Sequence, residues 1–528
     1  MKAFLHIFIL YTFFSETLLK QRTSERKTNL QTEEIFLIGD AHIELLYDSN
    51  SESGDPYKCL NTVDFLNYTN NPYDLGRYNC NTNRNLIKVV LERIRKENPR
   101  PKAIIYTGDS APVGLMKYNI SKTAQRNNTL NKMINRQSLA NISQLFQEYF
   151  PETDILVNVG DNDFYEGDKA PKNESKLEQY ENWDEQFFAN VKNPKQFTNL
   201  QRTLAEGLFY EYKLNKYLKI VSINQILFNH KNSDNDMSLD PWLQLYWLNN
   251  TLFHSKEKIL LTMHIGTYPN IWGNTTYYMW KEPYLQTLEY IVYQNREKII
   301  CMFGSHGHWK MFGVRSPFIF NNNKNFDFIP LVNYFGYISV PSISPVYYNN
   351  PGFMKITYQT NTSRIIDFEQ RHFQLNLTID NEERYSRNQN YTSEELEELW
   401  NITYSYREDL GFTNFDSNDI ADFLVNRRSD KSVNEIFYTL LGGFRRSSEY
   451  PEDREFNRRA VQLMGIIDYD DEREFECGHL VLYSNEMEEC KSKIKQYLKY
   501  LNKSNSNSNT VSSISSKIKV ETGKSEDI

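Results

Sequence analysis

The sequence is poor in several features that define common classes of protein. Only 5 of its 528 residues are cysteines, too few for a scaffold built from disulfides. There is no basic excess, because 60 Lys and Arg stand against 68 Asp and Glu, a net charge of −8. A nucleic-acid polymer is therefore not expected as a partner, since phosphate binding requires a basic surface. Global disorder is excluded as well, because 39% of the residues are hydrophobic, with 36 Tyr and 32 Phe.

Apolar runs long enough to span a bilayer, about 20 residues, are also missing. The apolar run 3–14 follows Lys2 and gives way to the polar Ser15 and Glu16. A charged start followed by a short apolar run is typical of a secretory signal peptide. We predict a signal peptide over residues 1–18 and a linker over 19–34. The mature chain is then expected without a transmembrane segment, either secreted and extracellular or in the lumen of a lysosome or vacuole.

In an oxidising compartment, even a few cysteines can form stable disulfides. Cys59 and Cys80 could close one disulfide, and Cys477 and Cys490 another, while Cys301 lies in the apolar run 299–303 and is expected as a buried free thiol. Twelve Asn-x-Ser/Thr sequons agree with a secreted glycoprotein, although several would arise by chance in so Asn-rich a chain. The candidates for glycosylation are Asn67, Asn119, Asn141, Asn274 and Asn376.

Short apolar runs alternate with helical patterns over the first 304 residues. The runs are 35–38, 103–106, 155–159, 218–223, 259–263 and 299–303. Apolar residues at helical spacing lie between them, as in Leu86, Val90 and Ile94, and again in Trp242, Leu245 and Leu248. This alternation predicts an α/β fold, a layered β-sheet sandwich flanked by helices.

The pattern changes after about residue 380. Ser393 opens a segment that resembles a capping box, and helical runs follow to about residue 500. We predict a sandwich domain over 35–380, a helical C-terminal subdomain over 381–502 and a disordered tail of low complexity over 503–528.

Acidic and imidazole side chains follow five of the six apolar runs. In open α/β sheets the loops at the carboxyl ends of the strands converge on one edge, where ligands bind. A single Gly-Asp after a strand is usually a turn, but here the series recurs in order. The members are Asp40, His42, Asp109, Asp161, His264, His306 and His308.

Seven such groups at one edge would repel or remain unsatisfied without a cation. Carboxylate and imidazole together suit Zn, Mn or Fe, and seven groups exceed what one tetrahedral ion needs. Two divalent metals about 3.5–4 Å apart could clamp a phosphoryl group and lower the pKa of a bridging water toward roughly 7. The series therefore predicts a dimetal hydrolase of phosphate esters.

The blocks resemble those of the calcineurin-like metallophosphoesterases, whose signature reads D-x-H, G-D, G-N-[HN]-[DE], H and G-H-x-H. More specifically, the chain resembles the acid sphingomyelinase-like phosphodiesterases, with endopolyphosphatases as relatives. The specific marks are segments 74–80, 107–112, 243–248, 341–351 and 373–377. The resemblance extends from about residue 35 to residue 500.

The resemblance implies a role for each member of the series. Asp40, His42 and His308 would bind the first metal, Asp109 would bridge, and a second set would hold the other metal. That second set is Asp161, His264 and His306. A metal-bridged hydroxide would attack a phosphodiester or phosphoanhydride, with zinc as the metal and with Asp109, His264 and Asn162 at the reacting group. The implied substrates are a sphingomyelin-like lipid, a nucleotide or polyphosphate, and the lipid would add peripheral contact with a lipid surface.

The chain departs from this pattern at the residue that would protonate the leaving group and at two neighbouring motif positions. Val113 stands where the family has a His that protonates the leaving group, Asn162 stands where His is most common, and Asp161 replaces Asn. Losing a general acid costs about 10²–10⁴-fold in rate. Three alternatives follow: substrates with good leaving groups, another donor such as His230, or a metal-binding pseudoenzyme or glycoprotein with a role in recognition.

Overall fold

The computed structural model describes a large part of the chain. The described residues are 31–47, 59, 75–114, 124–167, 169–233, 241–267, 270–272, 275–277, 279–315, 335–378, 391–429, 436–437, 440 and 442–444. The predicted signal peptide over 1–18 and the predicted tail over 503–528 lie outside them.

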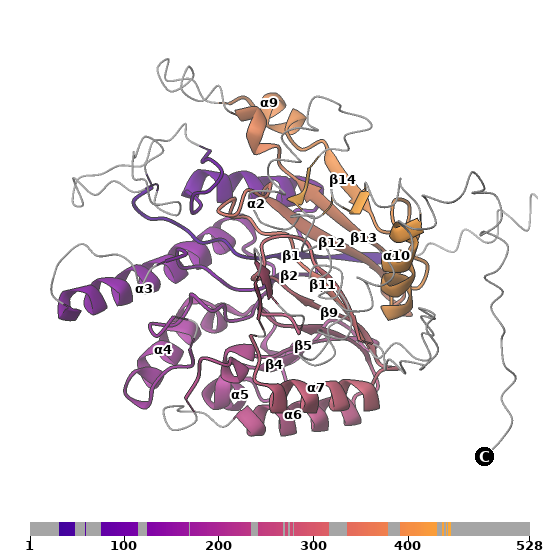
Figure 1. Ribbon diagram of the computed structural model, residues 1–528, viewed down its shortest axis with the longest axis horizontal. Coiled ribbons are helices and arrows are strands. Elements are labelled where there is room, and N and C mark those ends of the chain that lie inside the picture. Colours follow the sequence, from indigo (N-terminus) through magenta and orange to yellow (C-terminus); the bar gives the residue numbers. More distant parts are fainter. Residues whose placement is uncertain are drawn as a thin grey trace, which may run out of the picture.

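Two sheets of six strands form the centre of the fold (Figure 1). The strands are β1 (Thr32–Ile38), β2 (Ala103–Tyr106), β3 (Ile155–Val157), β4 (Tyr210–Lys213), β5 (Leu218–Ser222), β6 (Lys258–Thr262), β7 (Asn270–Trp272), β8 (Thr275–Tyr277), β9 (Ile299–Gly304), β10 (Phe312–Arg315), β11 (Phe335–Ser339), β12 (Gly352–Gln359), β13 (Ile365–His372) and β14 (Ile402–Ser405). The first sheet has the order β14-β13-β12-β1-β2-β3, and the second has the order β10-β11-β9-β6-β5-β4. The hairpin of β7 and β8 stands apart.

Helices flank the two sheets. They are α2 (Arg84–Glu97), α3 (Ala124–Tyr149), α4 (Asn173–Gln186), α5 (Leu200–Gly207), α6 (Pro241–His254), α7 (Glu282–Gln294), α9 (Ser393–Glu398) and α10 (Ser417–Ser429), with short 3₁₀ turns at Phe188–Asn190, Pro194–Gln196, Gln225–Phe228 and Leu375–Thr378. In α2 the Asn83 side chain caps the first turn by accepting from the Leu86 amide at 2.9 Å, and Leu86, Val90 and Ile94 are buried.

All six apolar runs are strands, and they divide equally between the two sheets. β1, β2 and β3 pair in parallel through α2 and α3, and β5, β6 and β9 pair in parallel through α6 and α7. Side chains from the two sheets meet in a common core, where the rings of Phe303 on β9 and Phe368 on β13 lie 5.5 Å apart. The predicted α/β sandwich flanked by helices is therefore confirmed.

The predicted core stripe of α6 needs one correction. Trp242 is 47% exposed, whereas Leu245 and Leu248 are buried as predicted. Gln244 takes the buried place instead, because its amide accepts from the backbone of Asn224 at 2.7 Å and donates to it at 2.9 Å. A polar residue with a complete set of partners can thus lie in a core where a hydrophobic pattern alone would place tryptophan.

The segment after residue 380 contains a strand that the sequence pattern missed. β14 pairs antiparallel with β13 and forms an edge of the first sheet. The capping box is present one residue earlier than expected, with Thr392 as the cap and Glu395 as its reciprocal partner. Residues 445–502, which form nearly half of the predicted helical subdomain, lie outside the described part.

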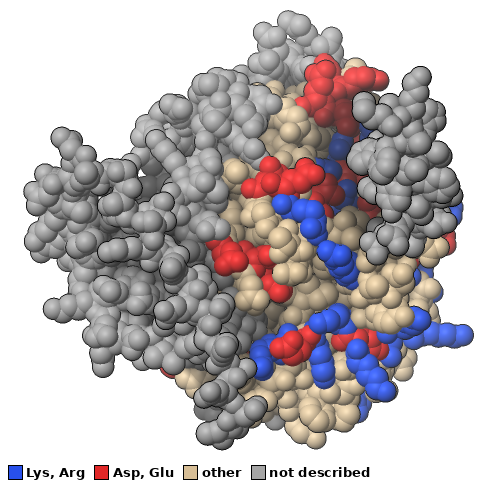
Figure 2. Space-filling view, turned by 90° about the vertical axis from the view of Figure 1, so that its right-hand side faces the viewer, with Lys and Arg blue, Asp and Glu red and all other residues tan. Residues whose placement is uncertain are grey.

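The described surface carries charges of both signs. Figure 2 shows one face on which Lys and Arg alternate with Asp and Glu. Among the described residues, none of the helices has the length and apolar character needed to cross a membrane.

Candidate metal centre

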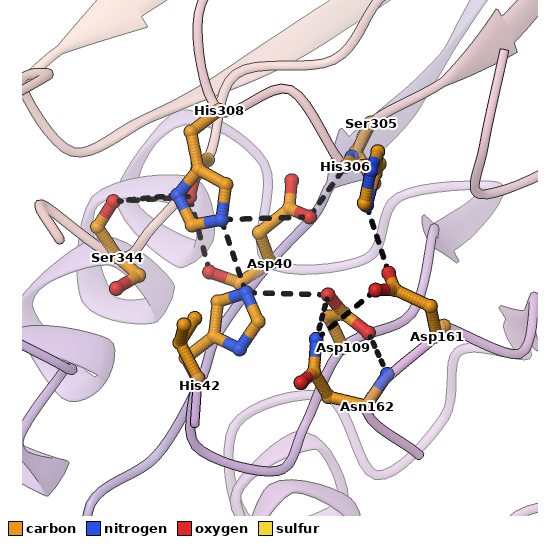
Figure 3. A network of polar contacts seen from close by, with 12 residues as sticks. Asp40, His42, Asp109, Asp161, Asn162, Ser305, His306, His308 and Ser344 are labelled. Carbon is orange, nitrogen blue, oxygen red and sulfur yellow. Dashed lines mark hydrogen bonds and ion pairs between the residues drawn. The ribbon is translucent and has the colours of Figure 1, made fainter. Parts of the chain in front are cut away.

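The loops that follow β1, β2, β3, β6 and β9 bring the seven predicted ligands together. Figure 3 labels all of them except His264. Their ligand atoms form two groups, each with all atoms within 4.8 Å of one another. The first group is Asp40, His42 and His308, and the second group is Asp109, Asp161, His264 and His306. The family resemblance implies the same two sets, except that it places Asp109 between them as a bridge.

In the first group, the imidazole nitrogens that could bind an ion face one another. His42 Nδ1 lies 2.7 Å from the Ala111 carbonyl oxygen, which can only accept, so the proton is on Nδ1 and the Nε2 lone pair is free to bind. His308 Nδ1 lies 3.3 Å from the Ser344 carbonyl oxygen, and burial together with His42 holds the pKa of His308 well below its usual range. The two Nε2 atoms lie only 3.0 Å apart, an arrangement that a shared cation would stabilise.

Asp40 strengthens this conclusion. Its side chain is fully buried, and Oδ2 has no hydrogen-bond partner among the described residues. Burial raises its pKa to about 7, with Asp109 acting in the same direction. A buried carboxylate oxygen without a partner is costly, so a cation is the group that this site fits.

The second group is held together by imidazole–carboxylate contacts. Asp161 Oδ1 lies 2.8 Å from His264 Nε2 and 2.8 Å from His306 Nδ1. Burial opposes the charges, but Asp109 and Asp161 raise the pKa of His264 well above its usual value, and Asp161 raises the pKa of His306. Against its own burial, His306 and His264 hold the pKa of Asp161 well below its usual range. Without an ion these residues are ion pairs, and with an ion they are carboxylate and imidazole ligands.

Asp109 lies between the two groups. Its Oδ2 is 3.3 Å from His42 Nε2 of the first group and 3.3 Å from His264 Nε2 of the second. Asn162 fixes the orientation of this carboxylate, because its backbone amide donates to Oδ1 at 2.9 Å and its side-chain amide donates to Oδ2 at 3.0 Å. The geometry fits a carboxylate shared by two ions.

The backbone at the site is unusual. Five of the seven predicted ligands have a positive φ: Asp40, His42, Asp109, His306 and His308, with values from 40° to 65°. Residues other than glycine rarely adopt this left-handed conformation, and each costs of order 1–3 kcal/mol. The strain concentrates where the side chains must converge, which is typical of a functional site.

A fourth aspartate, Asp163, holds the loop of the bridging ligand, a role that the sequence pattern does not indicate. Its carboxylate accepts from the backbone amides of Gly160 at 2.9 Å, Asp109 at 2.8 Å and Ser110 at 2.7 Å. Burial and Asp109 raise its pKa to about 6. Asp163 ends the motif 160–163, but only the folded chain shows that its target is backbone rather than metal.

The residues around the missing acid occupy different places. Val113 is half-buried, and Asn81 accepts from its amide at 3.0 Å, which positions the loop without supplying a proton donor. His230 is exposed and its Nδ1 lies 3.2 Å from the Met279 carbonyl oxygen. Ser305, where the family has Gly, places its hydroxyl 3.0 Å from His264 Nδ1, beside the 2.7 Å bond from that nitrogen to the Thr107 carbonyl.

Only some of the cysteines and glycosylation candidates expected of a secreted protein lie within the described part of the chain. Cys59 and Cys80 form a disulfide, and Cys301 is a buried free thiol. Asn141 is half-buried in α3, and its side chain contacts Arg84 and the Gln137 carbonyl. The other candidates for disulfides and glycosylation, which are Cys477, Cys490, Asn67, Asn119, Asn274 and the side chain of Asn376, lie outside the described part.

No family model matches the chain. Among curated proteins, it is 29% identical over 305 residues to "Sphingomyelinase phosphodiesterase D" of Dictyostelium discoideum, a match covering 55% of the chain and 60% of that relative. It is 25% identical over 363 residues to "Sphingomyelinase phosphodiesterase C" of the same organism, covering 66% and 74%. It is 26% identical over 315 residues to the human "Cyclic GMP-AMP phosphodiesterase SMPDL3A", covering 58% and 63%. The chain thus spans under two thirds of the first and third of these relatives.

Similar solved structures include a dimetal phosphatase from Danio rerio, with 10% identity, a TM-score of 0.36, and coverage of 64% of this chain and 94% of that one. The calcineurin-like phosphoesterase YfkN from Bacillus subtilis has 10% identity, a TM-score of 0.30, and coverage of 70% and 98%. At these TM-scores the structures add no argument about the site. The sequence relatives, however, confirm the resemblance carried by the strand-end motifs, because over part of its length the chain is similar to sphingomyelin phosphodiesterases.

Proposed function

We propose that the chain is a dimetal phosphodiesterase that hydrolyses phosphodiester or phosphoanhydride bonds. The observation that carries the proposal is the position of Asp109 Oδ2, 3.3 Å from a ligand nitrogen of each group. A carboxylate in that position can join two cations into one centre. When bound, the ions would supply Lewis acidity and an activated water for attack on phosphorus.

The chain's own residues orient the centre. Asn162 holds Asp109 by two hydrogen bonds, so that the bridging carboxylate cannot rotate. His264 and Asp161 are buried, which excludes water from one side of the centre and strengthens each electrostatic contact. Such preorganised charge is usually a large contribution to catalysis.

The lack of an imidazole at Val113 indicates the substrate class. A poor leaving group needs a proton, whereas a nucleotide anhydride or polyphosphate leaves readily without one. We therefore propose substrates with good leaving groups, among which a nucleotide anhydride or polyphosphate ranks before a sphingomyelin-like lipid. Peripheral contact with a lipid surface is expected only if the substrate is the lipid.

We further propose zinc as the metal and a secreted or lysosomal location. Buried imidazole and carboxylate donors suit zinc. The Cys59–Cys80 disulfide supports an oxidising compartment, because such bonds are rare in the cytosol.

A second candidate function is a metal-stabilised recognition protein without turnover. The observation that favours it is the side chain of Val113, which cannot donate a proton. The same metal centre, disulfide and glycans would then serve stability alone.

The deciding experiment measures hydrolysis by the purified chain with zinc. Bis(p-nitrophenyl) phosphate, p-nitrophenyl phosphate, ATP and sphingomyelin are compared, beside Asp109→Ala as the control. We expect turnover of the good leaving groups and background rates for the variant. Equal rates for wild type and variant on every substrate would leave the recognition protein as the function.

Substitutions at Val113 test whether the chain depends on a good leaving group. Val113→His should raise turnover of poorly leaving substrates by up to about 10²–10⁴-fold while changing that of p-nitrophenyl esters little. Val113→Leu is the matched control, since it alters shape without adding a donor. No gain with His would place the acid elsewhere.

A further inference from the structure

Helix α6 carries an exposed stripe whose chemistry the metal centre does not use. Trp242, Tyr246, Asn249 and Phe253 follow one another at steps of four, three and four residues, which places them on one face of an α-helix. Tyr246 is 73% exposed and Phe253 is 69% exposed. The 14 residues of α6 include no Asp, Glu, Lys or Arg.

The exposed surface continues onto the neighbouring helix. α6 and α7 lie side by side along the second sheet (Figure 1), and the rings of Trp242 and Tyr284 are 4.8 Å apart. On α7, Tyr290 is 64% exposed. Large exposed aromatic side chains gathered on one surface usually indicate that something covers them.

Asn249 lies within this stripe and begins the sequon 249–251. Its side chain is exposed, with Tyr246 one turn before it and Phe253 one turn after it. Asn141, by contrast, is half-buried, and its amide donates to the Gln137 carbonyl at 2.9 Å. Of these two helical sequons, that of Asn249 therefore has the more exposed asparagine.

We propose that Asn249 carries an N-linked glycan whose first sugars cover Tyr246 and Phe253. In the modification a bond forms between Asn249 Nδ2 and the anomeric carbon of a sugar. The sugar–phosphate bond of a lipid-linked pyrophosphate donor breaks, the pyrophosphate leaves, and the amide loses one proton. This inference rests on the proposed passage through the secretory pathway.

The physical basis is the two-sided character of a sugar ring. The C–H face of a pyranose is apolar and can lie on an aromatic ring, while its hydroxyl groups remain hydrated. A glycan attached between two exposed rings would therefore remove apolar area from water without a partner protein.

A lipid surface fits the stripe less well. A bilayer would have to desolvate Asn249 and Asn250 at the middle of the stripe, which is costly for amides without partners. The nearby cation Lys298 lies 6.0 Å from the Phe253 ring centroid, and its ammonium donates to the carbonyl oxygens of Leu252 and Phe253 at 2.8 Å each. The Lys298 ammonium is therefore already hydrogen-bonded to the end of α6, rather than directed toward lipid headgroups.

The test uses the full chain produced in a eukaryotic secretory host. Peptide mass spectrometry after amidase treatment should show Asn249 converted to Asp in the wild type and in Thr251→Ser, which keeps the sequon. The conversion should be lost in Thr251→Ala, which retains the asparagine. Enzymatic removal of the glycan should lower the melting temperature and promote self-association, and Tyr246→Ser with Phe253→Ser should abolish that difference.

The outcomes separate this site from the proposed secretion. An unmodified Asn249 in a chain that carries a glycan at the exposed Asn361 would overturn the site alone. A chain without a glycan at any sequon would overturn the site together with the secretory location, while the hydrolase assay stays independent of both. Binding of the intact protein to phosphatidylcholine–phosphatidylserine vesicles that is lost in Tyr246→Ser would assign the stripe to lipid instead.

Discussion

The two ligand groups differ in how they satisfy their own charges when no ion is bound. In the second group, protonated His264 and His306 can neutralise Asp161, at contacts of 2.8 Å each. In the first group, the two Nε2 atoms face each other at 3.0 Å, and a carboxylate oxygen has no partner among the described residues. The ion pairs of the second group compete with the metal for its ligands, whereas the unpartnered oxygen of the first group would gain a partner from the metal. We therefore expect the first group to hold its ion more tightly.

The largest effect is expected from the residue that both groups share. Asp109→Ala removes the bridge, so both ions should bind more weakly and the rate should fall by more than the roughly 10–100-fold typical of residues outside the metal shell. Metal analysis after gel filtration measures the loss. Retention of two equivalents would contradict the shared position of Asp109.

A matched pair of substitutions tests the order of affinity. His308→Ala should abolish binding at the first group, and His306→Ala should weaken the second, each leaving close to one equivalent per chain. Titration with a competing chelator should remove the second-group ion from the wild type first. The reverse order would mean that the ion pairs of the second group do not compete with metal.

Asp163→Asn should weaken both groups without removing a ligand. The charge-assisted bonds from four backbone amides become weaker, so the Asp109 loop loses its fixed position. We expect a loss of about 10–100-fold in metal affinity, with the spectrum of the cobalt-substituted protein shifted. Asp422→Asn, at an exposed position of α10, is the control.

The pH dependence of stability should change between the metal-free and the loaded protein. The raised pKa values of His264 and His306 mean that the folded metal-free state holds protons which the unfolded state has lost above about pH 6.5. Its stability should therefore fall as the pH rises above 6.5, by about 1.4 kcal/mol per pH unit for each such proton. Metal displaces these protons and becomes more firmly bound as pH rises. Melting curves at pH 6.5–8 with EDTA and with zinc measure the two slopes, which should not coincide.

The smallest effect is expected at Ser305. Its hydroxyl shares the His264 Nδ1 proton with the Thr107 carbonyl, so Ser305→Gly removes the longer of two contacts. A hydrogen bond of this kind contributes about 0.5–1.5 kcal/mol, which corresponds to a few-fold change in affinity at the second group. The first group should be unaffected, and a change there would show that the groups are coupled beyond Asp109.

The six strands formed by the apolar runs and the convergence of the seven Asp and His residues could be predicted because they depend on local pattern. Five of the six apolar runs are followed by an Asp or His, and parallel strands deliver their carboxyl ends to one edge. The hydrogen bonds of Asp163 could not be predicted, since its targets lie up to 54 residues away. β14 was missed because an edge strand of four residues carries little pattern by itself. The left-handed backbone conformation of five ligands was not predicted, because the sequence pattern does not specify which Asp or His adopts a positive φ.

Those left-handed residues have a consequence for the lifetime of the loaded protein. An ion can leave only when several ligands swing away, and each ligand that does so can relax to an ordinary conformation. Rebinding then requires the loops to return together, so release and uptake should follow different time courses. A chain emptied of metal would expose these loops to proteases and to amide hydrogen exchange, while the strands beneath them stay protected. The supply of metal would in this way set how long each molecule survives.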